Sequence, residues 1–252
     1  MCFRGSFIHD ITQVEQRYGV TRDPVLQEKK DLFFGYHKNG FDHPTFGVIR
    51  QEYPDLFLAG IWGITPPSKT FEELESYYKE ASRFGGGLNA RSEKVFDHFL
   101  YKEAIYSKRC IIPLSGFYEP HKTMINGKEV SVPFFFKNRD KSLLTVAGIY
   151  TVLPGGATTF TMLTKPGSPL FSRIHNKKER QIVLLPPELE KEWVENDLNK
   201  SQIIELINTD FNDKGLQAYP VTRDLYSRKY IIDDLEAHQP IQIKELNDIQ
   251  QL

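Results

Sequence analysis

The second residue of this chain is a cysteine, and it directly follows Met1. Removal of the initiator methionine before this small residue would leave Cys2 as the mature N-terminus, with a thiol and an α-amine in one residue. A free α-amine has a pKa of about 8 and an ordinary thiol about 8.5, so we expect both nucleophilic forms near neutral pH. Such a 1,2-aminothiol captures aldehydes, because the amine forms an imine and the thiolate then closes a thiazolidine ring. The alternative is that the Met-Cys start has no chemical role and the thiol lies buried.

Two further polar side chains follow a triple glycine at 85–87. Asn89 and Arg91 stand between that glycine run and a predicted helix, where backbone amides and a guanidinium could face an anion. The alternative is a simple connecting turn, with Arg91 in a surface ion pair, and spacing alone favours it.

A carboxylate and an imidazole complete the candidate chemistry. Glu119 ends the aromatic run SGFYE, and burial beside Tyr118 would raise its pKa toward neutrality, as general acid–base catalysis requires. Otherwise it is a surface residue at a strand end. His175, between two predicted strands, could shuttle protons near pH 7 or simply hydrogen-bond a carbonyl. Trp62 could offer a face to a nucleobase, although most such tryptophans lie in a core.

The elements that would position these residues begin with helices and one buried strand. Asp10 and Gly19 bound a predicted amphipathic helix over 10–20, and the apolar run 56–64 predicts a buried strand. Thr70 and Glu73 form a capping-box pattern for a helix over 71–83, and Ser92 predicts a second helix extending to about residue 107.

The second half of the chain is richer in β-structure. Five short aromatic and β-branched runs follow residue 109, helices are predicted after Pro187 and over 201–208, and a strand over 216–222. We expect an α+β fold, with a curled mixed or antiparallel β-sheet or an open barrel as its core and helices around it. We expect one domain over 1–235 and a polar C-terminal tail over 236–252.

Composition limits the classes of partner. A formal net charge of −1 over 252 residues excludes a globally basic nucleic-acid coat, so any anionic partner is bound locally. The two cysteines, Cys2 and Cys110, are too few for a disulfide framework, and the histidines lack metal-ligand spacing. We therefore expect no metal and no cofactor. We find no signal peptide or membrane-spanning segment, and we expect a cytoplasmic monomer.

Six segments in order resemble the SOS response-associated peptidase (SRAP) family. They are Met1-Cys2, AGIWGITP, LNARSE, RCIIPLSGFYE, LLTVAGIY and RIHN, and the likeness runs from residue 2 to about 222. The resemblance implies an SRAP-like fold and a sensor of abasic sites in single-stranded DNA, joined to them covalently by a thiazolidine at Cys2. It also implies lyase or autoprocessing peptidase activity. An abasic site is partly a ring-opened aldehyde, which is the electrophile that a 1,2-aminothiol selects.

The resemblance also assigns residue roles. Asn89 would position the cysteine amine, Glu119 would move protons during sugar opening and imine formation, and His175 would assist at the sugar oxygen. DNA would be bound by the residues Arg4, Trp62, Arg91 and Lys177.

Two departures from the family pattern affect these roles. Pro120 stands where family members usually have tryptophan, and HNKKER replaces a stretch with an Arg-Met-Pro pattern. Lys177 would then act as a point charge without the bidentate geometry of arginine.

Two other classes of function remain open from the residues alone. One is an N-terminal nucleophile hydrolase or self-processing peptidase, in which the same thiol attacks an amide. The other is a single-strand DNA binder without catalytic activity.

Overall fold

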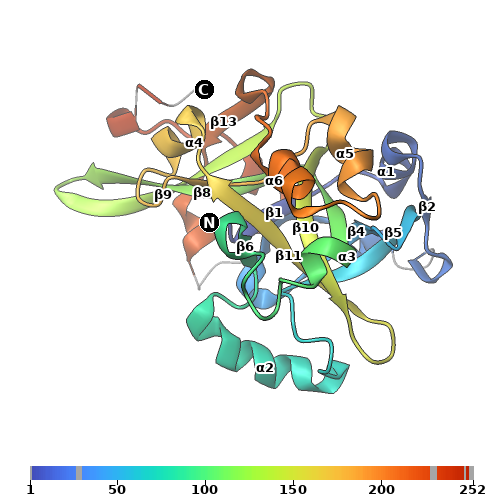
Figure 1. Cartoon of the computed structure of the whole chain (residues 1–252). Helices are drawn as coiled ribbons and strands as arrows, with labels where there is room; N and C mark the ends of the chain where they lie inside the picture. Colours follow the sequence, from blue (N-terminus) through green and yellow to red (C-terminus); the bar gives the residue numbers. More distant parts are fainter. Residues whose placement is uncertain (1, 27–29, 228–231, 247, 250–252) are drawn as a thin grey trace.

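A computed structural model describes residues 2–26, 30–227, 232–246 and 248–249 (Figure 1). Within these ranges the strands form two sheets, with short helices around them, and side chains from both sheets share one large hydrophobic core. The predicted α+β class with a curled sheet is confirmed.

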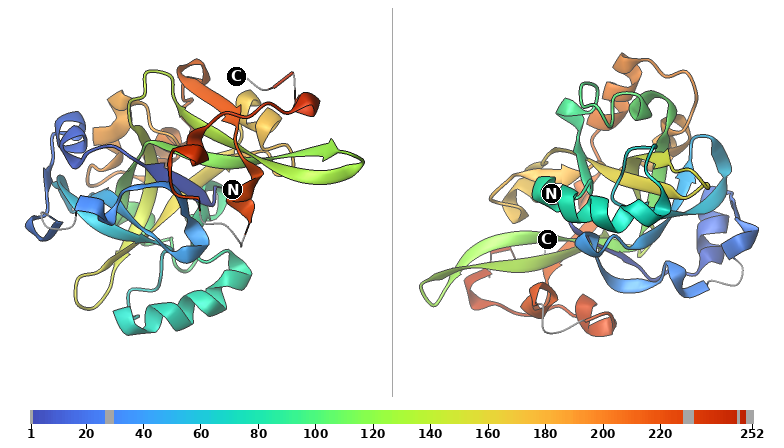
Figure 2. Two further views of the ribbon diagram at one scale, coloured as in Figure 1. Left: turned by 180° about the vertical axis from the view of Figure 1, so that it is seen from behind. Right: turned by 90° about the horizontal axis from the view of Figure 1, so that it is seen from below.

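The first sheet has five strands and holds the start of the chain. Its strands, in spatial order, are β13 (Leu216–Pro220), β9 (Lys128–Asn138), β8 (Gly116–Ile125), β1 (Arg4–Phe7) and β3 (Gly35–Asn39). On β1, Gly5 lies opposite Phe117 of β8 and Lys38 of β3, both antiparallel. The β8–β9 hairpin extends from the body as a long arm (Figure 2). Because β1 lies between two strands, its position relative to β8 is fixed by backbone hydrogen bonds.

Part of the second sheet curls into a closed ring. Its strands, in order, are β12 (Arg180–Ile182), β11 (Thr158–Pro166), β10 (Leu144–Val152), β7 (Arg109–Leu114), β4 (Thr45–Arg50), β5 (Tyr53–Trp62) and β2 (Thr21–Arg22), with β6 (Asn89–Arg91) on β11. A parallel pairing of Phe160 with Trp62 joins β11 to β5 and closes the ring. Its strands contribute buried apolar side chains such as Phe46, Trp62 and Phe160 to the core, together with buried threonines such as Thr159 and Thr161.

Six short α-helices lie outside the sheets. They are α1 (Ile11–Tyr18), α2 (Leu74–Ala81), α3 (Ala104–Ser107), α4 (Pro169–Ile174), α5 (Glu190–Trp193) and α6 (Lys200–Asn208) in the described part of the chain. None of them is long and apolar enough to cross a bilayer. Helix α2 stands at the rim, apart from the strands, in Figures 1 and 2.

Cap residues determine where the first two helices begin and end. Asp10 caps α1 in a reciprocal capping box with Gln13, and Gly19 ends it with a φ of 68°. Thr70 and Glu73 form the predicted capping box, which opens a 3-10 turn that continues into α2. Both predicted helices are confirmed.

The predicted helix from Ser92 to about 107 is wrong. Asn89–Arg91 forms strand β6, Ser92–Lys94 is a single 3-10 turn, and only Ala104–Ser107 is α-helical. A strand pairing just before the predicted helix and a local hydrogen bond within it explain the difference. The edge of β11 takes up the backbone of β6, and the His98 ring accepts the Leu100 N–H that a helix would use.

Several residues after 235 are packed against the first sheet. Ala237 and Leu246 are buried, and the His238 ring nitrogen lies 3.0 Å from the Ser6 hydroxyl. The division into a domain over 1–235 and a tail over 236–252 stays a prediction.

Candidate functional site

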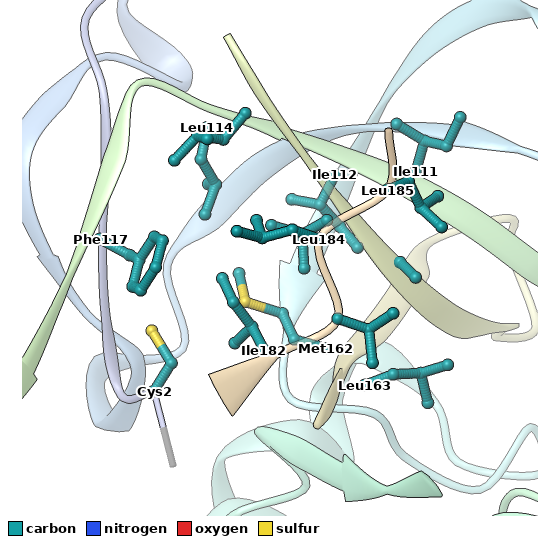
Figure 3. Packing of buried hydrophobic residues seen from close by; sticks show 14 of the residues in the cluster. Cys2, Ile111, Ile112, Leu114, Phe117, Met162, Leu163, Ile182, Leu184 and Leu185 are labelled. Atoms are coloured by element: carbon teal, nitrogen blue, oxygen red, sulfur yellow. The ribbon is translucent and has the colours of Figure 1, made fainter. Parts of the chain in front are cut away.

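Cys2 lies where the chain enters β1. Its side chain is fully buried, and its Sγ donates to the Arg4 carbonyl at 3.3 Å. Figure 3 shows the sulfur turned toward the apolar cluster that includes Phe117 and Ile182.

Burial changes the chemistry of this thiol. Loss of hydration, with a further contribution from nearby Glu119, raises the pKa of Cys2 far above its ordinary value. The expectation of an ordinary thiol pKa was therefore wrong, because the sequence does not reveal burial. In this geometry the sulfur stays protonated until a base removes its proton.

Asn89 holds the Cys2 backbone. Strand β6 places it opposite Met162 of β11, and its Nδ2 donates to the Cys2 carbonyl at 2.7 Å. Its Oδ1 is buried and accepts no hydrogen bond from the described residues. An amide in this position orients the start of the chain and keeps one acceptor available for a donor such as an amine.

Glu119 lies on β8, opposite Phe134 of β9, with no exposed surface. Burial raises the pKa of Glu119 to about 7. The carboxyl therefore has its acid and base forms in comparable amounts at neutral pH, the condition for general acid–base catalysis.

His175 follows helix α4 and lies next to this carboxyl, with its Nδ1 3.4 Å from Glu119 Oε2. The same Nδ1 lies 3.0 Å from the Arg180 carbonyl. Because a carbonyl only accepts, Nδ1 carries the proton and Nε2 keeps its lone pair. Burial lowers the pKa of His175 to about 4, so the ring is neutral at pH 7.

The four predicted DNA-binding side chains have different surroundings. Arg4 lies two residues from Cys2, with its guanidinium carbon 4.5 Å from the centre of the Tyr226 ring, and Arg91 is exposed at the end of β6. Lys177, 57% exposed, forms an ion pair of 3.0 Å with Glu129 at the arm.

Trp62 does not offer the exposed stacking face that we expected. It is fully buried, and its Nε1 donates to the Leu88 carbonyl at 2.8 Å. The ring thus supports the turn that leads into Asn89.

Arg180 is a site residue that sequence reasoning missed. Its guanidinium binds both carboxylate oxygens of Glu93, at 2.6 and 3.0 Å, and also the Thr164 carbonyl. Its own carbonyl accepts from His175. Arg180 therefore ties the segment after Asn89 to the loop of His175. The sequence showed Glu93 and Arg180 close to Asn89 and His175, but it did not show that the two charged side chains form a pair.

The arrangement suits nucleophilic capture assisted by proton transfer. Asn89 contacts Cys2, Glu119 lies two residues after Phe117 on the strand beside β1, and His175 lies next to the Glu119 carboxyl. Among the described residues, no group of three or more histidine, cysteine or acidic side chains is placed to hold a metal ion.

Comparisons with known proteins identify relatives. Residues 1–227 match the family model described as SOS response associated peptidase (SRAP). The abasic site processing protein YMR114C of Saccharomyces cerevisiae is 29% identical over 171 residues, which are 65% of this chain and 42% of that protein. The chain thus matches less than half of the yeast protein's length. The abasic site processing protein YoqW of Bacillus subtilis is 28% identical over 173 residues, 67% of this chain and 70% of that protein.

Solved structures share the fold. A crystal structure of a protein from Bacteroides thetaiotaomicron has a TM-score of 0.80 and 26% identity, covering 96% of this chain and all of that one. A protein from Bordetella bronchiseptica, 24% identical, has a TM-score of 0.66, covering 88% of this chain and all of that one.

Proposed function

Because this chain belongs to the SOS response associated peptidase (SRAP) family, we propose that it processes abasic sites in DNA, as the names of its curated relatives indicate for them. The reaction is covalent capture. Removal of Met1 frees the α-amine of Cys2, and that residue forms a thiazolidine with the ring-opened aldehyde of an abasic site. The observation that supports this proposal is that Asn89 binds the Cys2 backbone while Glu119 lies on the strand paired with β1.

The raised pKa of the thiol implies an order of steps. The amine attacks the aldehyde carbon first, the carbinolamine loses water, and an imine forms. The sulfur then adds to the imine carbon while its proton leaves, and the imine nitrogen ends as a protonated secondary amine or its conjugate base. The sum is aldehyde plus aminothiol giving thiazolidine and water, without any oxidant or reductant.

Glu119 both donates and accepts protons in this reaction. Its acid form protonates the sugar ring oxygen and the departing hydroxyl, and its base form accepts the proton of the Cys2 thiol. A pKa of about 7 for Glu119 suits both roles. His175 is neutral and carries its proton on Nδ1. Its Nε2 therefore has a lone pair, and we assign to this atom the role of hydrogen-bond acceptor at the sugar hydroxyl oxygen.

DNA binding rests on phosphate contacts. Arg4, Arg91 and Lys177 are the cations we assign to the backbone, and such contacts give affinity without sequence preference. Single-stranded DNA as partner, lyase activity at the imine stage, a monomeric state and a cytoplasmic, DNA-associated location belong to the same proposal.

A gel assay tests the proposal directly. Purified protein, with Met1 removal verified by intact mass, is incubated with an abasic single-stranded oligonucleotide and with an intact one. We expect a species that survives denaturation only with the abasic strand. Absence of that species with the wild-type protein would contradict covalent capture.

The family's description as a peptidase gives the second candidate, in which the Cys2 thiol attacks an amide. Mass spectrometry separates the two. Capture adds the mass of the DNA fragment less one water to the chain, whereas a peptidase releases cleaved peptides.

Asn89→Leu is expected to slow capture about 10-fold to 100-fold, because the chain start loses its amide anchor while the number and branching of the side-chain heavy atoms are kept. The measurement is the single-turnover rate of adduct formation. Asn138→Leu is the matched control, since Asn138 Nδ2 also donates to a backbone carbonyl, that of Leu143, at 3.2 Å. It should lower stability by about 1 kcal/mol and leave the rate unchanged. Equal rates of adduct formation for the two variants would show that Asn89 has no role in the reaction.

A further inference from the structure

The guanidinium of Arg4 has an unusual set of neighbours. Arg4 is the first residue of β1, two positions after Cys2, and its Nε is buried without a hydrogen-bond partner in the described residues. No carboxylate within those ranges forms an ion pair with it. Burial lowers the pKa of Arg4, yet an arginine remains charged at neutral pH.

Tyr226 is the group that faces this cation. The guanidinium carbon of Arg4 lies 4.5 Å from the centre of the Tyr226 ring, within the range of a cation–π interaction. Because Arg4 lies two positions after Cys2, the tyrosine ring borders the candidate site. Burial raises the pKa of Tyr226, and its phenol stays neutral.

Two contacts hold Tyr226 in place. It ends the 3-10 turn Arg223–Tyr226, whose Leu225 is buried in a small cluster with Tyr118 and Phe135. The turn itself packs against strand β9 of the first sheet. The ring position is therefore fixed by the packing of the C-terminal part of the chain on the first sheet.

An aromatic partner leaves arginine chemically available. A carboxylate would neutralise the charge and occupy the N–H donors of the guanidinium, as Glu93 does for Arg180. A ring face attracts the cation through its π-electrons and uses none of those donors. Arg4 can thus be oriented without losing its capacity to bind an anion.

We propose that Tyr226 is a positioning residue for the DNA backbone: its ring holds Arg4 beside Cys2 with its N–H donors free for the phosphate next to the abasic site. This inference rests on the proposed function, since it concerns the binding step of the same reaction. It assigns to the segment after β13 a part in DNA binding. It also predicts which kinetic quantity responds, because an anchor for a phosphate contact affects binding before chemistry begins.

The test measures the rate of adduct formation against DNA concentration, which separates the apparent Kd from the maximal covalent rate. Tyr226→Phe, which keeps the ring, should behave like wild type within about twofold. Tyr226→Met, which keeps apolar volume without a ring, should raise the apparent Kd about tenfold and leave the maximal rate unchanged. Arg4→Met combined with Tyr226→Met should bind no worse than Arg4→Met alone, because both act through one contact.

A second series keeps the shape of the side chain in case Tyr226→Met does not fold. Replacing Tyr226 with phenylalanines carrying one, two and three fluorines withdraws π-electrons at constant shape. The apparent Kd should rise stepwise along that series.

The outcomes are distinct. If the wild-type protein forms no adduct, the proposed function fails, and Tyr226 is not in question. If the wild type forms the adduct but the fluorinated series shows no trend, the inference on Tyr226 is overturned. A loss confined to the maximal rate, or additive effects of the Arg4 and Tyr226 changes, would overturn it as well.

Discussion

Cys2→Ala reduces stable capture of abasic DNA to background, while the affinity for the same strand stays within about threefold of wild type. The alanine still permits removal of Met1 and keeps the α-amine, so an imine can form. Without sulfur no ring closes, and the imine hydrolyses when the protein is denatured. A denaturing gel should show no adduct, and borohydride added before denaturation should trap the imine as a stable amine.

Cys110→Ala is the matched control for this variant. Cys110 is also fully buried and its thiol pKa is likewise raised by burial, but it lies within β7 and has no free amine. The variant should form the adduct at the wild-type rate. A stable adduct with Cys2→Ala, or its loss with Cys110→Ala, would show that the captured group is bound elsewhere.

The local features of the fold were predictable from sequence. Helix α1 begins after Asp10 and ends before Gly19 because those residues satisfy its terminal amides and carbonyls, and such signals lie within a few residues. The ring closure was not predictable. Phe160 pairs with Trp62 across a long stretch of chain, and no residue near either strand specifies its partner. The helix predicted from Ser92 failed for a related reason, since β11 pairs with Asn89–Arg91 directly before it and holds the chain extended there.

The candidate site divides in the same way. The residue types that could do chemistry were visible, because Cys2, Asn89 and Glu119 are reactive or polar groups in apolar surroundings. The effect of burial on the pKa values of these groups was only partly predictable from the sequence. A pKa raised toward neutrality was one of two alternatives for Glu119, the other being a surface position, whereas an elevated thiol pKa at Cys2 was not expected.

Pairs of distant residues were beyond reach of sequence reasoning. The contacts of Arg180 with Glu93 and of Arg4 with Tyr226 join segments far apart in the chain. Their partners follow from how the two sheets pack, which no local pattern encodes.

Glu119→Gln lowers the rate of adduct formation by about 10²-fold to 10⁴-fold, the usual contribution of a general acid–base group. Glutamine keeps the shape of the side chain and cannot exchange a proton. The wild-type rate should also change with pH around 7, the pKa of Glu119, and that dependence should vanish in the variant. The measurement is a single-turnover rate from pH 5 to 9. Glu52→Gln is the control, because Glu52 is half-exposed and paired with Lys108, neither of which has a role in the proposed reaction; its rate should equal that of wild type.

Although the Glu119 carboxyl speeds the proposed reaction, its ionisation lowers the stability of the folded protein. Its pKa rises from 4.5 to about 7 on folding, so between those values the native state binds more protons than the unfolded state. The free energy of unfolding is therefore highest below pH 4.5 as far as this group is concerned, and falls as pH rises toward 7. The loss is about 3 kcal/mol above pH 7, at 1.36 kcal/mol for each pKa unit.

Glu119→Gln removes that loss, so denaturant unfolding at pH 8 should show the variant to be more stable than wild type although it reacts far more slowly. At pH 4 the difference in stability should shrink by about the same 3 kcal/mol. A variant that is both slower and equally destabilised at the two pH values would mean that the carboxyl is a packing group whose charge does not change near neutrality. The opposite signs of the two effects are what separate a proton-transfer residue from a structural one.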